Sequence, residues 1–154
     1  MPSATIFMPE NRLEGILLNP LAPTAEVLVV AAETRVGTLR ESIRAYVRET
    51  SERIFLLAEK PEEEVFAECR ALGLHAQSIC EVASLAGWTT IGEAARGIIE
   101  MVEALINSGA WHTEALQLHV DALALLNKDP TPSDAVAEQI LRQLKEMRER
   151  VGAL

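Results

Sequence analysis

The sequence has few aromatic residues, and this limits the folds that it can adopt. Aromatics make up 4% of its 154 residues, whereas hydrophobic residues make up 49%. The core must therefore be built mainly from Ala, Leu, Val and Ile, which suits closely packed helices better than a sheet stabilised by aromatic pairs. No stretch shows the two-residue alternation of a half-buried strand. We predict an all-α fold.

Cysteine is also scarce. Cys69 and Cys80 are eleven residues apart, about three turns of a straight helix, which is too far for a disulfide. Their spacing is not that of a metal site, and no other cofactor motif is present. We therefore expect free thiols in a reducing, cytoplasmic setting, without a metal or other cofactor.

Basic residues are outnumbered by acidic ones, 14 against 23, and the net charge is −9. This balance disfavours a nucleic-acid partner, because nucleic-acid binding depends on Lys and Arg that neutralise phosphates. It also disfavours adsorption to an anionic membrane surface. No apolar run reaches the roughly 18 residues that a membrane-spanning helix needs, and no signal peptide is apparent.

Prolines at positions 2, 9, 20 and 23 divide the chain. They predict an irregular N-terminal arm over residues 1–23, followed by one helical bundle domain over residues 24–154. The first helix should begin with Thr24 as its N-cap and extend to Ala58. Its length of roughly 50 Å means that part of it should protrude, kink near Gly37, or pair with a second copy of the chain. An apolar seam of coiled-coil type supports this helix: Leu28, Ala32, Val36, Leu39, Ile43, Val47, Ile54 and Leu57.

Four further helices follow in the sequence. The first runs from Pro61, at its first helical position, to residue 87, and the second starts at a capping box formed by Thr90 and Glu93. Ser108 and Gly109 end that helix, and the next spans residues 113–127. The last helix is capped by Thr131 and buries one stripe of residues: Val136, Ile140, Leu144, Met147 and Val151.

The usual catalytic signatures are missing: there is no phosphate-binding glycine loop, no nucleophile elbow and no zinc-binding His-Glu-x-x-His helix. His112 lies in a turn, and His119 is expected to pack between helices among apolar residues. His75 borders an apolar stripe and is the one histidine worth testing as a phosphoacceptor. An enzyme is therefore the less favoured interpretation.

Arg40, Arg44 and Arg48 recur every four residues and form one basic ridge on the first helix. Two interpretations remain open. The ridge is either a solvated helix face or a surface that docks an acidic region of a second subunit or a signalling partner.

The stretch Gln77-Ser78-Ile79-Cys80-Glu81-Val82-Ala83-Ser84-Leu85-Ala86-Gly87 resembles the central motif of histidine-phosphotransfer (Hpt) domains. The resemblance implies an antiparallel four-helix bundle of Hpt type. In its register Gln77 takes the place of the phosphoacceptor histidine, Cys80 that of a lysine and Glu81 that of a glycine. The resemblance therefore implies a pseudo-Hpt domain that has lost the transfer chemistry.

Most of residues 11–127 also resembles the CheE-type accessory proteins of alphaproteobacterial chemotaxis clusters, through the long first helix, the Hpt-like turn and residues 108–123. This implies a non-catalytic adaptor that binds a response regulator receiver domain or a histidine kinase. Its binding surface would comprise Gln77, Glu81 and Ser84, flanked by Arg40, Arg44 and Arg48. Two alternatives remain: an enzyme, either a phosphotransferase using His75 or His119 or a phosphatase using Gln77, and a homodimeric scaffold joined through residues 24–58.

Overall fold

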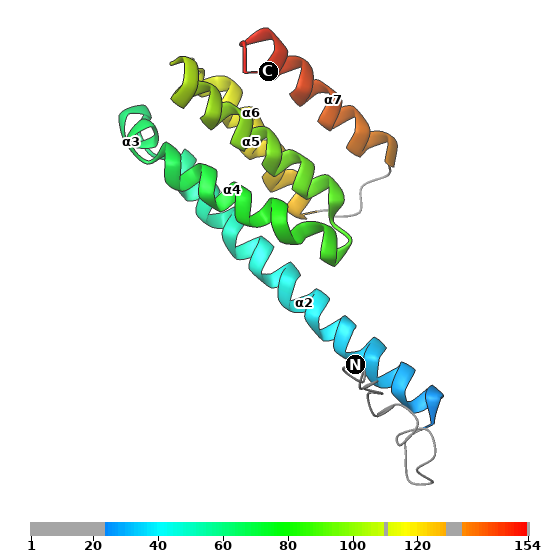
Figure 1. Ribbon diagram of the computed structural model, residues 1–154. Helices are drawn as coiled ribbons and strands as arrows, with labels where there is room; N and C mark the ends of the chain where they lie inside the picture. The colour runs from blue at the N-terminus through cyan, green and yellow to red at the C-terminus, as the bar shows by residue number, and fades with distance from the viewer. Residues whose placement is uncertain (1–23, 110, 129–133, 154) are drawn as a thin grey trace, which may run out of the picture. The chain divides into compact units, whose positions relative to one another are not determined.

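The computed structural model describes residues 24–109, 111–128 and 134–153 (Figure 1). These residues form helices and no strand, so the predicted all-α fold is confirmed. The elements are α2 (Ala25–Ala58), α3 (Glu62–Ala67), α4 (Cys69–Ala83), the 3-10 turn η1 (Ser84–Ala86), α5 (Thr89–Ser108), α6 (Thr113–Lys128) and α7 (Asp134–Arg150). The predicted arm over residues 1–23 and the predicted cap at Thr131 lie outside the described residues.

The chain divides into two compact units, Met1–Gly37 and Thr38–Leu154. In the first unit the described residues are the beginning of α2. The hydroxyl of Thr24 accepts a hydrogen bond from the Val27 N–H at 3.4 Å, so the predicted N-cap is confirmed. The helix continues without interruption through Gly37. All described side chains of this unit are exposed, including the apolar run Val27 to Val30.

The second unit holds the core. Residues 38–58 of α2 and the helices α4, α5 and α6 run antiparallel to their neighbours in the chain, as short connections require (Figure 1). Each of these four segments contributes a fully buried aliphatic side chain: Ile54, Ile79, Ile98 and Leu123. Burial of one such side chain contributes roughly 1.5–3 kcal/mol. The core is therefore aliphatic, as the shortage of aromatic residues predicts.

The helix predicted over residues 61–87 is divided into α3, α4 and η1. Glu68 separates α3 from α4 with φ −100° and ψ 10°, outside the helical region. Its carboxylate pairs with the Lys60 ammonium at 2.7 Å, and the ring of Phe66 meets Trp111 edge to face at 5.8 Å. These contacts hold α3 as a separate short helix that is not continuous with α4. Pro61 is the N-cap of α3 and not its first helical residue.

The predicted capping box at the start of α5 is wrong. Trp88 is the N-cap and makes no side-chain capping bond, so Thr90 lies inside the first turn. The reason is that Trp88 is buried, with 3% of its surface exposed. Its backbone N–H also donates a hydrogen bond to the Ala83 carbonyl at 2.9 Å. The predicted end of α5 is confirmed, because Gly109 has φ 70° and donates to the Leu105 carbonyl at 2.9 Å.

Helix α7 packs less deeply than the stripe predicted for it. Leu144 is buried, but 49% of Val136 is exposed, so this residue was assigned to the wrong face. Ile140, Met147 and Val151 are partly buried against the core. A polar side chain that the stripe did not include, Arg148, makes the deepest polar contacts of α7.

Candidate functional site

Helix α4 has two distinct faces. Its inner face is buried and carries Leu72, Ala76, Ile79 and Ala83. Its outer face, continued by η1, carries Leu74, Gln77, Glu81, Ser84 and Leu85, all of which are exposed. Their spacing of three and four residues places them along one side of the helix. We call this set of five residues the α4 outer face.

Two leucines mark the ends of the α4 outer face. Leu74 is 65% exposed and Leu85 is 62% exposed. Eleven residues at 1.5 Å per residue separate them by about 16 Å along the helix. Between them the Gln77 amide donates a hydrogen bond to the Glu81 carboxylate at 3.0 Å. The middle of the surface is therefore polar and its two ends are apolar.

Cys80 does not take part in this surface. Its side chain is half-buried, and the thiol donates a hydrogen bond to the Gly92 carbonyl of α5 at 3.0 Å. Burial raises the pKa of the Cys80 thiol, and neighbouring Arg96 opposes that rise only in part. The Cys80 side chain is therefore neutral and turned toward α5.

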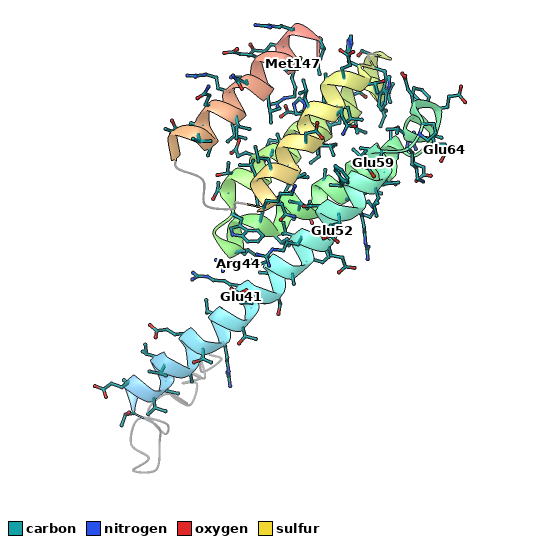
Figure 2. The ribbon with its side chains drawn as sticks, turned by 180° about the vertical axis from the view of Figure 1, so that it is seen from behind. Glu41, Arg44, Glu52, Glu59, Glu64 and Met147 are labelled. Carbon is teal, nitrogen blue, oxygen red and sulfur yellow. The ribbon has the colours of Figure 1, made fainter. Side chains whose placement is uncertain are left out.

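Two of the three arginines of the predicted ridge meet at the end of α4. Arg44 donates to the Ala86 carbonyl at 3.4 Å and to the Glu41 carboxylate at 2.7 Å, and Figure 2 shows it beside the turn between α4 and α5. Its guanidinium lies 5.5 Å from the ring centroid of Trp88, and that of Arg48 lies 5.3 Å from it. Arg44, Arg48 and Trp88, which we call the Arg–Trp cluster, therefore adjoin the Ser84 end of the α4 outer face.

Sequence reasoning missed the role of Trp88. In the sequence, Trp88 only marked the end of a predicted helix. Nothing in the spacing of residues links Trp88 to arginines about forty positions earlier. The third arginine, Arg40, is exposed one turn before Arg44. His75 is half-buried on α4, two residues before Gln77, and so points to a different side of the helix. Within the residues that the structure describes, no three His, Cys, Asp or Glu side chains gather as a metal site.

His119 is a packing residue, as predicted. It is fully buried in α6. Its Nδ1 lies 2.7 Å from the Ala115 carbonyl, and its Nε2 lies 3.0 Å from Nη1 of Arg148. Burial lowers the pKa of this imidazole. Both ring nitrogens are engaged inside the bundle, so His119 is not available to an external phosphoryl group.

Comparison of the chain with protein-family models, with curated proteins and with solved structures finds no match. None of the described helices is long and apolar enough to cross a membrane. The surface of α4 and its neighbours is therefore the basis for inferring a function.

Proposed function

We propose that the protein is a non-catalytic adaptor of cytoplasmic two-component or chemotaxis signalling. It binds a response regulator receiver domain or a histidine kinase through the α4 outer face and the Arg–Trp cluster. The observation that carries this proposal is the exposure of Leu74 on α4 and Leu85 on η1, above 60% for each, while the opposite face of α4 is buried.

Exposed apolar side chains grouped on one rigid face are typical of protein interaction sites. Burial of Leu74 and Leu85 in a complex would contribute roughly 1.5–3 kcal/mol for each side chain. The guanidinium groups of Arg44 and Arg48 lie at one end of this face, and cations at the edge of an interface select an acidic partner surface and speed association. The surface therefore fits a partner that offers two apolar contacts about 16 Å apart, a polar region between them and an acidic edge beside Arg44 and Arg48.

The chemistry of the α4 outer face supports binding without phosphoryl transfer. Gln77 has an amide where an Hpt domain carries its imidazole, and this amide is bonded to Glu81. The Glu81 carboxylate would repel a phosphoryl group, and the inward-facing thiol of Cys80 supplies no positive charge to stabilise one. These features favour a pseudo-Hpt bundle in which the helical scaffold remains and the transfer reaction is lost.

Binding of purified response regulators and histidine kinases from the same chemotaxis system, measured by isothermal titration calorimetry, tests the proposal. Leu74→Asp and Leu85→Asp should each weaken binding at least about tenfold, as expected for hot-spot residues. Ile106→Asp is the matched control, because Ile106 is 50% exposed on α5 and belongs to neither proposed surface. Absence of binding to every regulator and kinase, in either phosphorylation state, would contradict the proposal.

The same complexes distinguish an adaptor from a phosphatase. An adaptor leaves the lifetime of the regulator's acyl phosphate unchanged when the protein is added in excess. A phosphatase that used the Gln77 amide to orient water would shorten that lifetime, and Gln77→Ala would restore it. Transfer of phosphate to His75 would appear as acid-labile, base-stable label on the protein that is absent from His75→Gln.

A second candidate function, a homodimeric scaffold, is favoured by the first unit. Val27, Leu28, Val29 and Val30 are each more than half exposed at the start of α2. Consecutive residues fan around a helix, but Leu28 and Val36, which are 51% and 47% exposed, both belong to the predicted seam, and pairing with a second copy would cover them. Sedimentation equilibrium of the full chain and of Leu28→Glu tests this: a dimer weakened by the substitution supports the scaffold, and a monomer at all concentrations contradicts it.

A further inference from the structure

Helix α7 is attached to the bundle by a buried polar contact. The guanidinium of Arg148 lies between two partners, with Nη1 3.0 Å from Nε2 of His119 on α6 and Nε 2.6 Å from Oε2 of Glu100 on α5. The Arg148 side chain is only 11% exposed. The pair of Nε and Oε2 is an ion pair without hydrogen-bond geometry, since neither atom has a hydrogen-bond partner in the described part of the chain. One side chain of α7 thus connects three helices.

The contact requires a neutral His119. The Ala115 carbonyl, 2.7 Å from Nδ1, can only accept a hydrogen bond, so Nδ1 carries the ring proton. Nε2 then presents a lone pair. Arg148 is always protonated and can only donate, so its Nη1 requires that lone pair. A second proton on the ring would remove the acceptor and place two cations 3.0 Å apart.

The contact lies in space that Gly97 of α5 leaves open. A Cβ atom at Gly97 would lie 2.6 Å from Cδ2 of His119 and 2.7 Å from Nη1 of Arg148. Both distances are shorter than a side chain can tolerate. The His119 ring and the Arg148 guanidinium are thus closely packed against the α5 backbone at Gly97.

The apolar attachment of α7 is small by comparison. Of its described residues, Ala137 and Leu144 are the buried hydrophobic ones. An open groove of about 530 Å³ remains between α6 and α7, lined in part by Leu118, Leu125 and Met147, the last labelled in Figure 2. The interface is therefore incompletely packed, and the polar contact of Arg148 adds to apolar side chains of α7, Ile140, Leu141 and Met147, that are only partly buried.

We propose that α7 is a pH-gated helix, which is docked while His119 is neutral and is released from α5 and α6 when His119 takes up a proton. The charged groups at this point are Arg148 from α7 and Glu100 from α5, and Glu100 is already engaged by Arg148. Ala115 of α6 and Leu144 of α7 contribute backbone carbonyls. Among the described residues, Arg148 is the one charged side chain that acts on the ring directly.

The direction of the pH effect follows from the environment of the ring. Burial, and then the charge of Arg148, lower the pKa of His119 below its usual 6.5, against the opposing effect of the carbonyls. The released form therefore binds more protons than the docked form between the lowered pKa and 6.5. Docking is fully favoured above pH 6.5 and weakens as the pH falls from there toward the lowered pKa.

Hydrogen–deuterium exchange of the full chain tests the proposal. After correction for intrinsic rates, amide protection in α7 should fall severalfold, and by at most about tenfold, between about pH 7.5 and about pH 5.5, because a single ring with an ordinary pKa of 6.5 in the released form allows no larger change. Protection in α4 should stay unchanged. Arg148→Met should give low α7 protection at both pH values. Equal α7 protection at both pH values in the unmodified chain would overturn the proposal, and so would an equal loss in α4, which indicates global unfolding.

Two histidine variants assign the effect to one ring. His119→Gln keeps an acceptor for Arg148 that does not titrate, so α7 should remain docked at about pH 5.5. His75→Gln is the matched control and should keep the full pH dependence. If His119→Gln does not fold, an NMR titration of the unmodified chain decides: the pKa of His119 must lie below its ordinary 6.5 and the ring must titrate in step with the α7 signals. A titration of His119 without shifts in α7 contradicts the proposal.

Discussion

A Cβ atom at Gly97 would lie 2.6 Å from Cδ2 of His119, closer than non-bonded carbon atoms approach. Gly97 itself is buried in α5, and His119 is fully buried in α6. The ring is also held by the Ala115 carbonyl at 2.7 Å. Close approach of α5 and α6 at this point therefore depends on a residue without a side chain.

Gly97→Ala should consequently destabilise the protein. Alanine is the better helix former, but the added methyl group must displace a held ring, and such overpacking costs about 1–3 kcal/mol. Urea unfolding at about pH 7.5 measures the change. Gly92→Ala in the same helix is the control: its Cβ would meet the Cβ of Ala83 at an ordinary 3.6 Å, so it should be neutral or stabilising by up to about 1 kcal/mol. Equal effects of the two substitutions would contradict the packing argument.

The two faces of α4 predict different costs for the same kind of truncation. Ile79 is fully buried, whereas Leu74 is 65% exposed. Ile79→Ala should cost about 2–5 kcal/mol of unfolding free energy, and Leu74→Ala less than about 0.5 kcal/mol. Urea midpoints of the two variants with unchanged slopes measure this difference. A comparable loss in Leu74→Ala would mean that the α4 outer face is covered within the chain and is not free to bind a partner.

The periodicity of the sequence predicted the helices well where the apolar stripe was regular. Val47 and Ile54 of the predicted seam are buried, and Gly109 ends α5 as predicted. The prediction failed where tertiary contacts decide local structure. Burial of Trp88 sets the start of α5 ahead of the Thr90 capping box, and the Lys60–Glu68 ion pair accompanies the separation of α3 from α4.

The candidate site, like the fold, could be predicted only where it depends on a single helix. Helical spacing places Gln77, Glu81 and Ser84 on one exposed face, because that relation depends on a single helix. The packing of Arg44 and Arg48 on Trp88 joins residues about forty positions apart, and the contact between His119 and Arg148 joins residues 29 apart. No local pattern encodes such pairs, so the sequence singled out Arg44, Arg48 and His119 but not Trp88 or Arg148.

Cys80 should react slowly with alkylating reagents in the folded protein. Burial raises the pKa of its thiol, and its hydrogen bond to the Gly92 carbonyl further disfavours the thiolate, which is the reactive form. Iodoacetamide labelling at about pH 7.5, followed by mass spectrometry of peptides, should modify Cys80 at least about tenfold more slowly than in urea. Rapid labelling of native Cys80 in the Cys69→Ser variant would show that the thiol is accessible from the α4 outer face.

The Arg–Trp cluster should contribute measurably to stability through the aromatic ring. A guanidinium over the face of Trp contributes about 0.5–1 kcal/mol at a partly exposed site. Arg48→Met keeps the aliphatic contact but removes the charge, so it should cost an amount in this range, and Arg44→Met somewhat more because it also loses the bond to the Ala86 carbonyl at 3.4 Å.

Fluorescence tests whether the lower stability of the arginine variants comes from their contact with the Trp88 ring. In a Trp111→Phe background, Trp88 is the single indole of the chain, and its burial predicts blue-shifted emission. Replacement of both Arg44 and Arg48 uncovers the ring on the side where the two side chains pack. The double variant should therefore shift the emission to the red and lose more stability than the sum of the single variants, because each remaining arginine still shields the ring. Additive losses with unchanged emission would mean that the arginines act only as solvated surface charges.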